Sequence, residues 1–217
     1  MISSSIARKL AMALSGVFLV LFLGQHFTIN MTSVISEKTF NSISHFMGTN
    51  PLVQFVLQPI LIFGVLFHFI MGFVLEIKNR KSRSTKYITF NGAANASWVS
   101  RNMILSGIVI LSFLGLHFYD FWFPEINYKY IEFRPENPDR YYEELVHKFH
   151  DRIKVILYSV SFFFLALHLY HGFASSFQTV GVNNKFSKSI KLFTVAFSIV
   201  VPLGFVFIAV FHHLNGQ

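Results

Sequence analysis

The sequence has 217 residues, of which 53% are hydrophobic and only 13% are charged, and its formal net charge is +8. Soluble domains contain about 25% charged residues, so this composition excludes an ordinary soluble domain and favours a membrane protein. The absence of Cys excludes disulfides and any zinc or iron–sulfur site held by cysteines of this chain. The basic residues lie in short connections, so we expect them to set membrane topology rather than to bind nucleic acid.

Five apolar stretches are long enough to cross a bilayer as helices of roughly 20 residues. They are Leu10–Ile29, Leu52–Leu75, Met103–Phe123, Ile153–Phe177 and Leu192–Phe211. The first is longer than the core of a signal peptide, so we expect it to be retained. The sequence therefore predicts an all-α fold, in which residues 1–217 form one membrane domain, an integral bundle of five transmembrane helices.

The charges between these stretches predict the orientation of the bundle. Basic residues dominate three regions that fall on one side of the membrane. These are Arg8 and Lys9, the connection 76–102 and the connection 178–191. The long stretch Tyr119–Arg152 on the other side contains more acids than bases. By the positive-inside rule, we expect the N-terminus in the cytoplasm and the C-terminus outside.

Histidines inside the spans sort into two depths. At a rise of about 1.5 Å per residue, His26 lies about 25 Å from the inner end of its span and His117 about 24 Å. On the two spans that run inward, His68 lies about 12 Å from the inner end and His168 about 15 Å. Four helices thus supply an outer pair, His26 and His117, and an inner pair, His68 and His168.

The local sequence sorts the four histidines in the same way. Both residues of the outer pair lie in a Leu-Gly-x-His-Phe string, and both residues of the inner pair begin a His-x-x-x-Gly string. Residues four apart share a helix face, so Gly72 and Gly172 remove a side chain beside His68 and His168. That would let a flat macrocycle lie against the backbone, although glycine also promotes close packing of membrane helices.

Two facing imidazoles are suited to ligate haem iron. A single membrane histidine is more often a hydrogen-bond partner between helices, and the prediction therefore depends on the paired arrangement. Zinc is the competing hypothesis, but it usually takes about four ligands at one depth, often with carboxylates or thiols. His171 is the main rival of His168 as a ligand. His147 and His150 lie in a polar stretch and are expected to be solvated, and no pattern singles out His212 or His213.

The chain resembles the single-chain dihaem cytochrome b of succinate dehydrogenases and fumarate reductases. The resemblance covers nearly the whole chain and depends on the order of several strings. These are the four span histidines, Gln25-His26, Phe40-Asn41-Ser42 with His45-Phe46-Met47, and His168-x-x-x-Gly172. The connection 124–151 looks like an insertion relative to shorter members of that family.

The resemblance implies a membrane anchor with two haem b groups that takes part in electron transport and the tricarboxylic acid cycle. His26 and His117 would ligate the distal haem iron, and His68 and His168 the proximal one. A flavoprotein subunit and an iron–sulfur subunit would dock on the cytoplasmic face of the bacterial inner membrane. Electrons from succinate would reach a quinone, with menaquinone favoured in dihaem members.

The resemblance also directs attention to residues near the membrane surfaces. Glu37 and His45, in the outer connection, are candidates for proton handling at a quinone site. Arg8, Lys9 and Arg101 begin spans on the inner side and could pair with haem propionates, although such residues are more often topology signals.

Two alternative functions remain open. One is a dihaem quinone-linked cytochrome b that serves another dehydrogenase, such as a hydrogenase or formate dehydrogenase. The other is a small transporter whose histidines relay protons, which usually shows acids or broken helices at mid-membrane. The chain has no nucleotide-binding glycine motif and no nucleophile triad, so we do not expect succinate chemistry on this chain alone.

Overall fold

A computed structural model describes residues 4–81, 102–181 and 187–216, and every regular element in these ranges is a helix. Five of them are long and apolar enough to cross a membrane: Ser5–Ile35, Val53–Lys81, Met103–Ile131, Arg152–Thr179 and Lys188–Asn215. The predicted all-α fold with five membrane-spanning helices is confirmed. Arg83, Lys86, Arg101 and Lys185, four of the basic residues used above, lie outside the described ranges.

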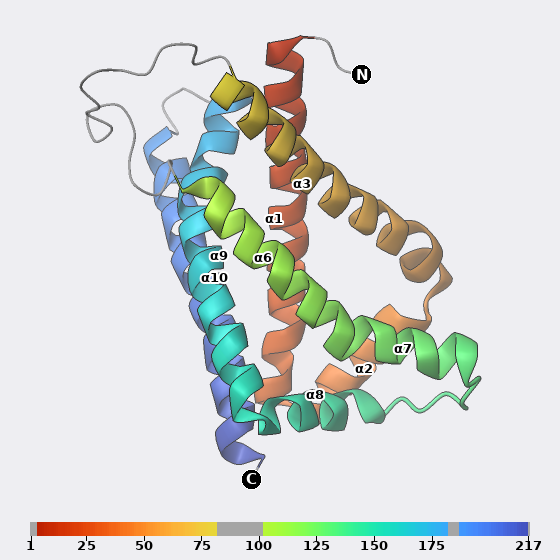
Figure 1. Cartoon of the computed structure of the whole chain (residues 1–217). Coiled ribbons are helices and arrows are strands. Elements are labelled where there is room, and N and C mark those ends of the chain that lie inside the picture. The colour runs from red at the N-terminus through yellow and green to blue at the C-terminus, as the bar shows by residue number, and fades with distance from the viewer. Residues whose placement is uncertain (1–3, 82–101, 182–186, 217) are drawn as a thin grey trace.

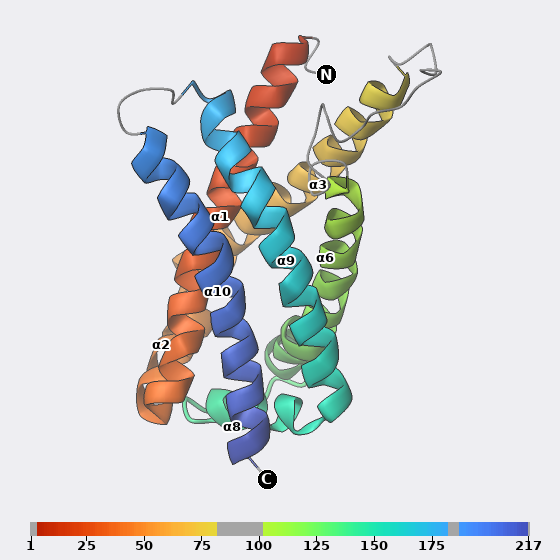
Figure 2. The same cartoon turned by 90° about the vertical axis from the view of Figure 1, so that its left-hand side faces the viewer.

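The helices follow one another up and down through the bundle (Figure 1). The spans consist of α1 (Ser5–Ile35), η1 (Val53–Leu57) with α3 (Gln58–Lys81), α6 (Met103–His117) with its extension, α9 (Arg152–Thr179) and α10 (Ser187–Asn215). The start of α1 and the end of α10 lie at opposite ends of the bundle (Figures 1 and 2). We call these ends the N-terminal and the C-terminal end of the bundle.

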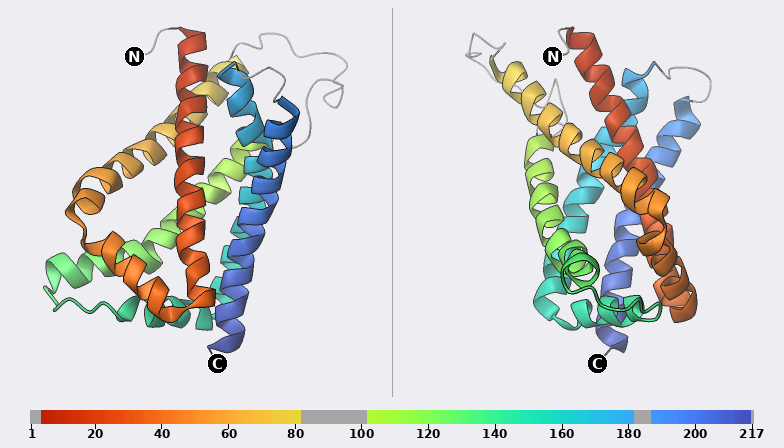
Figure 3. Two further views of the ribbon diagram at one scale, coloured as in Figure 1. Left: turned by 180° about the vertical axis from the view of Figure 1, so that it is seen from behind. Right: turned by 90° about the vertical axis from the view of Figure 1, so that its right-hand side faces the viewer.

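The helices pack unevenly around α1. Helices α9 and α10 lie side by side along the bundle, and α1 packs against both of them and against α3 (Figures 1 and 2). Helix α6 packs against α9. Helix α3 leans outward and has no buried residue (Figure 3). Many large apolar side chains are exposed along the spans, which is the surface that a lipid bilayer covers.

The main core lies between α9 and α10. Its most deeply buried residues are Tyr158 on α9 with Ile208 and Ala209 on α10, and Phe27 of α1 packs against it. Helix α8 (Arg140–His150) adds Leu145 and Phe149 to the same cluster. The tightest packing therefore surrounds the C-terminal half of the bundle.

Two further helices lie across the C-terminal end of the bundle (Figure 1). Helix α2 (Glu37–Thr49) begins at Ser36, whose extended backbone ends α1 and whose hydroxyl accepts a hydrogen bond from the Thr39 amide. Helix α8 (Arg140–His150) has one apolar face, which packs on α2, α9 and α10, and a charged face. The sequence prediction treated both segments only as connections.

The third span continues beyond the stretch predicted to end at Phe123. After His117 the chain forms a π-helical turn, η2 (Phe118–Trp122), a short helix α7 (Phe123–Ile126) and a second π-helical turn, η3 (Asn127–Ile131). Pro124 lies at the start of α7, directly after the π-helical turn η2. The connection 124–151 is thus a folded structure that extends the third span and adds α8.

Candidate functional site

The outer pair of histidines meets between α1 and α6. His26 lies on α1 and His117 is the last residue of α6, directly before the π-helical turn η2. Their ring centroids are 5.8 Å apart and their planes are 85° apart. With metal–nitrogen bonds of about 2 Å, two imidazoles on one metal ion have ring centres about 6 Å apart. The separation of the outer pair is therefore the one that axial ligation of a single iron requires.

The inner pair meets in the same way between α3 and α9. The ring centroids of His68 and His168 are 6.3 Å apart, with planes 68° apart. His171 makes no ring contact with His68 among the described residues, so the geometry favours His168 over its rival. Neither interplanar angle excludes a metal ion held by both rings of a pair. The role of the four histidines as ligands stays a prediction.

Serine hydroxyls fix the inner histidines from neighbouring helices. The Ser15 hydroxyl lies 3.0 Å from Nδ1 of His68, and the Ser106 hydroxyl lies 3.1 Å from Nδ1 of His168. Each hydroxyl donates its own hydrogen to a backbone carbonyl, that of Met12 or Met103. Each serine oxygen must therefore accept a hydrogen bond from Nδ1–H. This assigns the proton to Nδ1 and leaves the Nε2 lone pair of each inner histidine free for a metal.

These contacts reveal an internal repeat that the analysis of the sequence missed. Met12–Phe27 and Met103–Phe118 share the pattern Met-x-Leu-Ser-Gly followed by Phe-Leu-Gly-x-His-Phe. His68–Phe73 and His168–Phe173 share His-x-x-x-Gly-Phe. The chain therefore contains two copies of one two-helix unit, α1 with α3 and α6 with α9. Each histidine pair consists of equivalent residues from the two copies.

Glycines at equivalent positions of the two copies also have equivalent neighbours. A Cβ atom on Gly16 would lie 3.5 Å from Cε1 of His68, and one on Gly107 would lie 4.0 Å from Cε1 of His168. Gly72 and Gly172, which were predicted to leave a flat surface, face the terminal methyl groups of Met12 and Met103. Methionine side chains are flexible enough to adapt to a neighbouring cofactor.

The outer pair has an aromatic environment without serine partners. Phe22 stacks on His26, and Phe113 stacks on His117 at a centroid distance of 5.8 Å. Nδ1 of His117 is buried and has no hydrogen-bond partner among the described residues. Asn30 donates to the His26 carbonyl at 2.8 Å and lies 3.4 Å from both ring nitrogens of His26.

The described residues contain no group of three or more His, Cys, Asp or Glu side chains that could hold a metal ion. A zinc site with three or four protein ligands therefore has no support in this part of the chain. Bis-imidazole ligation needs only two residues, and both pairs fit it in distance and chemistry. The donor sets of this structure thus fit two haem groups.

The remaining histidines lie near the C-terminal end. His147 and His150 are exposed on α8, as predicted, and their rings stack on each other. His212 is buried, with Nε2 2.8 Å from the Ser33 hydroxyl, and His213 bonds through Nδ1 to the Phe149 carbonyl at 2.8 Å. These two residues hold α10 to α1 and α8, a role that their position at the end of a span did not reveal.

A polar pocket of about 250 Å³ lies at the C-terminal end of the bundle. Its lining includes His45 and Thr49 of α2, Lys129 near the end of the third span, and Arg140 and Tyr141 of α8. Nδ1 of His45 is buried and has no hydrogen-bond partner among the described residues. Glu37, the other predicted proton-handling residue, is exposed at the start of α2 and does not line this pocket.

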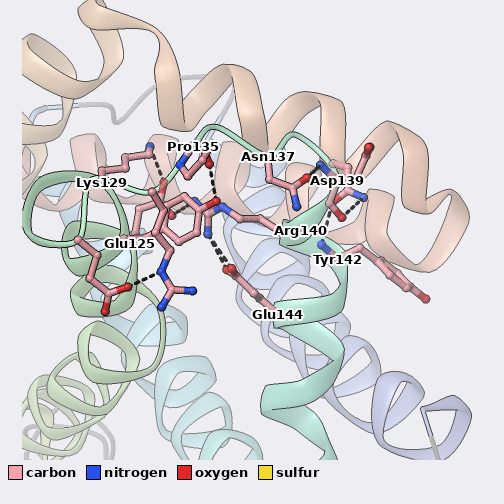
Figure 4. A network of polar contacts seen from close by, with 12 residues as sticks. Glu125, Lys129, Pro135, Asn137, Asp139, Arg140, Tyr142 and Glu144 are labelled. Carbon is pink, nitrogen blue, oxygen red and sulfur yellow. Dashed lines mark hydrogen bonds and ion pairs between the residues drawn. The ribbon is translucent and has the colours of Figure 1, made fainter.

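An ion-pair network around Arg140 holds the pocket together (Figure 4). Arg140 pairs with Glu125 and Glu144, and Glu125 also pairs with Lys129. Burial by itself would lower the pKa of Arg140, but the hydrogen bonds and charges of the two glutamates outweigh it and raise the pKa. Burial, with the charge of Glu125, raises the pKa of Tyr141. Both groups therefore keep their protons at neutral pH.

Comparison with known protein families, with curated proteins and with solved structures finds no match for the chain.

Proposed function

We propose that the chain is the dihaem cytochrome b anchor subunit of a succinate:quinone oxidoreductase. The observation that carries this proposal is the meeting of two histidine pairs, each at the ring separation that one metal ion between them requires. His26 and His117 would hold the outer haem, and His68 and His168 the inner one. When bound, haem iron would supply one-electron redox chemistry.

The residues of the chain itself would do the following. The serines keep the inner imidazoles in the tautomer that presents Nε2 to the metal. The aromatic rings around the outer pair exclude water. The pocket beside His45 is a candidate for the quinone head group, because a buried ring nitrogen without a partner can bind a quinone oxygen.

The partners follow from the same proposal. A flavoprotein and an iron–sulfur subunit would bind the N-terminal end of the bundle, on the cytoplasmic side of a bacterial inner membrane. Electrons would pass from that side through the inner pair to the outer pair and then to menaquinone. The physiological direction, succinate oxidation or fumarate reduction, depends on the partner subunits and the quinone.

Haem content of the purified chain tests the proposal. In mild detergent, a reduced-minus-oxidised spectrum with pyridine-haem quantification is expected to give two b-type haems per chain. His26→Ala and His68→Ala should each retain one haem. The haem left in His26→Ala should differ in midpoint potential from the haem left in His68→Ala. His147→Ala, on the exposed face of α8, is the matched control and should retain both.

The outcomes separate the alternatives. A folded wild-type chain, isolated with its native partners but without haem, would refute the cytochrome and favour a proton-relay transporter. Two haems with a co-purifying hydrogenase or formate dehydrogenase, in place of succinate dehydrogenase activity, would keep the ligand assignment and replace the partner.

A further inference from the structure

A buried carboxylate lies one helical turn beyond the outer pair. Asp120 is in the π-helical turn η2, three residues after His117, and its side chain is fully buried. Both of its oxygens have donors on α9: Lys154 forms an ion pair with Oδ1, and the Tyr158 hydroxyl donates to Oδ2 at 3.1 Å. The two donors occupy both oxygens of the buried carboxyl group and hold it against α9.

Tyr158 connects this carboxylate to the outer pair. Its ring centroid lies 6.4 Å from that of His117, and Phe113, Phe149 and Phe162 surround its ring. Lys154 precedes Tyr158 by about one helical turn of α9. It therefore lies about 6 Å further than Tyr158 toward the C-terminal end of the bundle. Its side chain is 24% exposed, whereas that of Asp120 is 0% exposed. The negative charge therefore lies on the side of the histidines and the positive charge on the side of the membrane surface.

The arrangement is specific to the outer pair. In the other copy of the repeat, Ile29 stands at the position equivalent to Asp120. The other ion pairs of the described residues lie at Glu76–Arg80 on α3 and among residues 125–144 at the C-terminal end. A buried ion pair adds little to stability compared with apolar side chains of similar size. Its place beside the outer pair, with donors from α9 on both carboxylate oxygens, points to an electrostatic role.

We propose that Asp120, held by Lys154 and Tyr158, is a positioning residue that sets the redox potential of the outer centre. This inference rests on the proposed function, in which the outer pair holds a haem. Reduction by one electron lowers the charge of the iron centre by one unit. A carboxylate nearby, at low dielectric, favours the more positive oxidised form and lowers the midpoint potential.

A redox titration of the haem absorbance, in the whole chain with its partners, tests this inference. Asp120→Asn keeps the size of the side chain, removes the negative charge and leaves Lys154 unpaired. The midpoint potential of the outer haem should rise, and that of the inner haem should not change. Glu76→Gln, which breaks the exposed pair with Arg80 at the other end of the bundle, is the matched control and should change neither potential.

A second variant covers the case in which Asp120→Asn does not accumulate. Asp120→Asn with Lys154→Met removes both charges and leaves none unpaired, so the outer potential should still rise, but less than in Asp120→Asn. Adding His26→Ala to either variant removes the outer haem, and the remaining potential should then equal that of His26→Ala alone.

Each outcome has a definite meaning. Two haems with wild-type potentials in Asp120→Asn, or in the double variant, would overturn the inference, as would a shift confined to the inner haem. Neither result would affect the proposed function, which is tested by the haem content and the co-purifying dehydrogenase of the wild-type chain.

Discussion

The inner histidines differ from the outer ones in the hydrogen-bond partner of the ring nitrogen Nδ1. Each inner ring has a serine partner on a neighbouring helix, whereas Nδ1 of His117 has none among the described residues. A hydrogen bond to the ring nitrogen that does not bind the metal orients a ligating imidazole and raises its basicity. The serines should therefore act on the inner centre alone.

Replacement of these serines tests that role. Ser15→Ala or Ser106→Ala should weaken retention of the inner haem by roughly 10-fold or more, the usual effect of removing an outer-shell partner. The outer haem should be retained. The measurement is the loss of each haem, resolved by its potential, on titration with a competing haem-binding protein.

The control uses a serine of the same helix without a histidine partner. Ser112 is exposed on α6 and donates to the Ile108 carbonyl at 3.0 Å, so Ser112→Ala should behave as wild type. Equal loss of both haems in Ser15→Ala would show that the serine supports the fold and not the inner ligand.

Some of these residues could be identified from the sequence and others could not. The histidine pairs follow from helix rise and from charges at the span ends, which are local quantities. Ser15 and Ser106 could have been found from the repeated Met-x-Leu-Ser-Gly string. The pairing of Asp120 with Lys154 joins two helices, and no local pattern encodes such a contact.

Among the elements, the short helices at the C-terminal end depend on tertiary contacts. Asn41 of α2 is buried, donates to the Asp139 carbonyl at 3.0 Å and accepts from the Tyr142 amide at 2.8 Å. Its single side chain thus holds the first turn of α8. This gives a structural role to the Phe40-Asn41-Ser42 string.

Replacement of Asn41 should release α8 while the five spans stay folded. Asn41→Ala leaves two backbone groups without their partner, at a cost of about 1–3 kcal/mol. Backbone amides of residues 140–150 should then exchange their hydrogens faster by about 10-fold, whereas those of α9 should not. Ser42→Ala, at an exposed neighbouring position, is the control. Unchanged exchange in α8 would contradict the assigned role of Asn41.

The five spans were predictable because apolar length alone identifies a membrane helix. Their ends were not, because α1 continues through polar residues beyond the apolar stretch. Thr32 and Ser33 donate to the carbonyls of Ile29 and Asn30, so both hydroxyl groups have hydrogen-bond partners within the helix. The π-helical turns after His117 have no equivalent signal in the sequence.

At the scale of the whole molecule, the two copies of the two-helix unit depend on each other. Residues 4–81 contain His26 and His68, and residues 102–181 contain His117 and His168. Each copy thus supplies one residue to each pair, and neither copy contains a complete pair. The fold produces two similar histidine pairs because two similar units face each other, while Asp120 lies near the outer pair.

Division of the chain between the copies gives the last prediction. Two fragments, cut between residues 81 and 102, should each bind no haem when produced alone, because each lacks the partner of both its histidines. Membrane helices can associate without a covalent link through packing and polar contacts, so co-production should restore two haems. His117→Ala in the second fragment should then leave one, the inner haem. Two haems retained by the co-produced fragments after His117→Ala would refute the pairing described above.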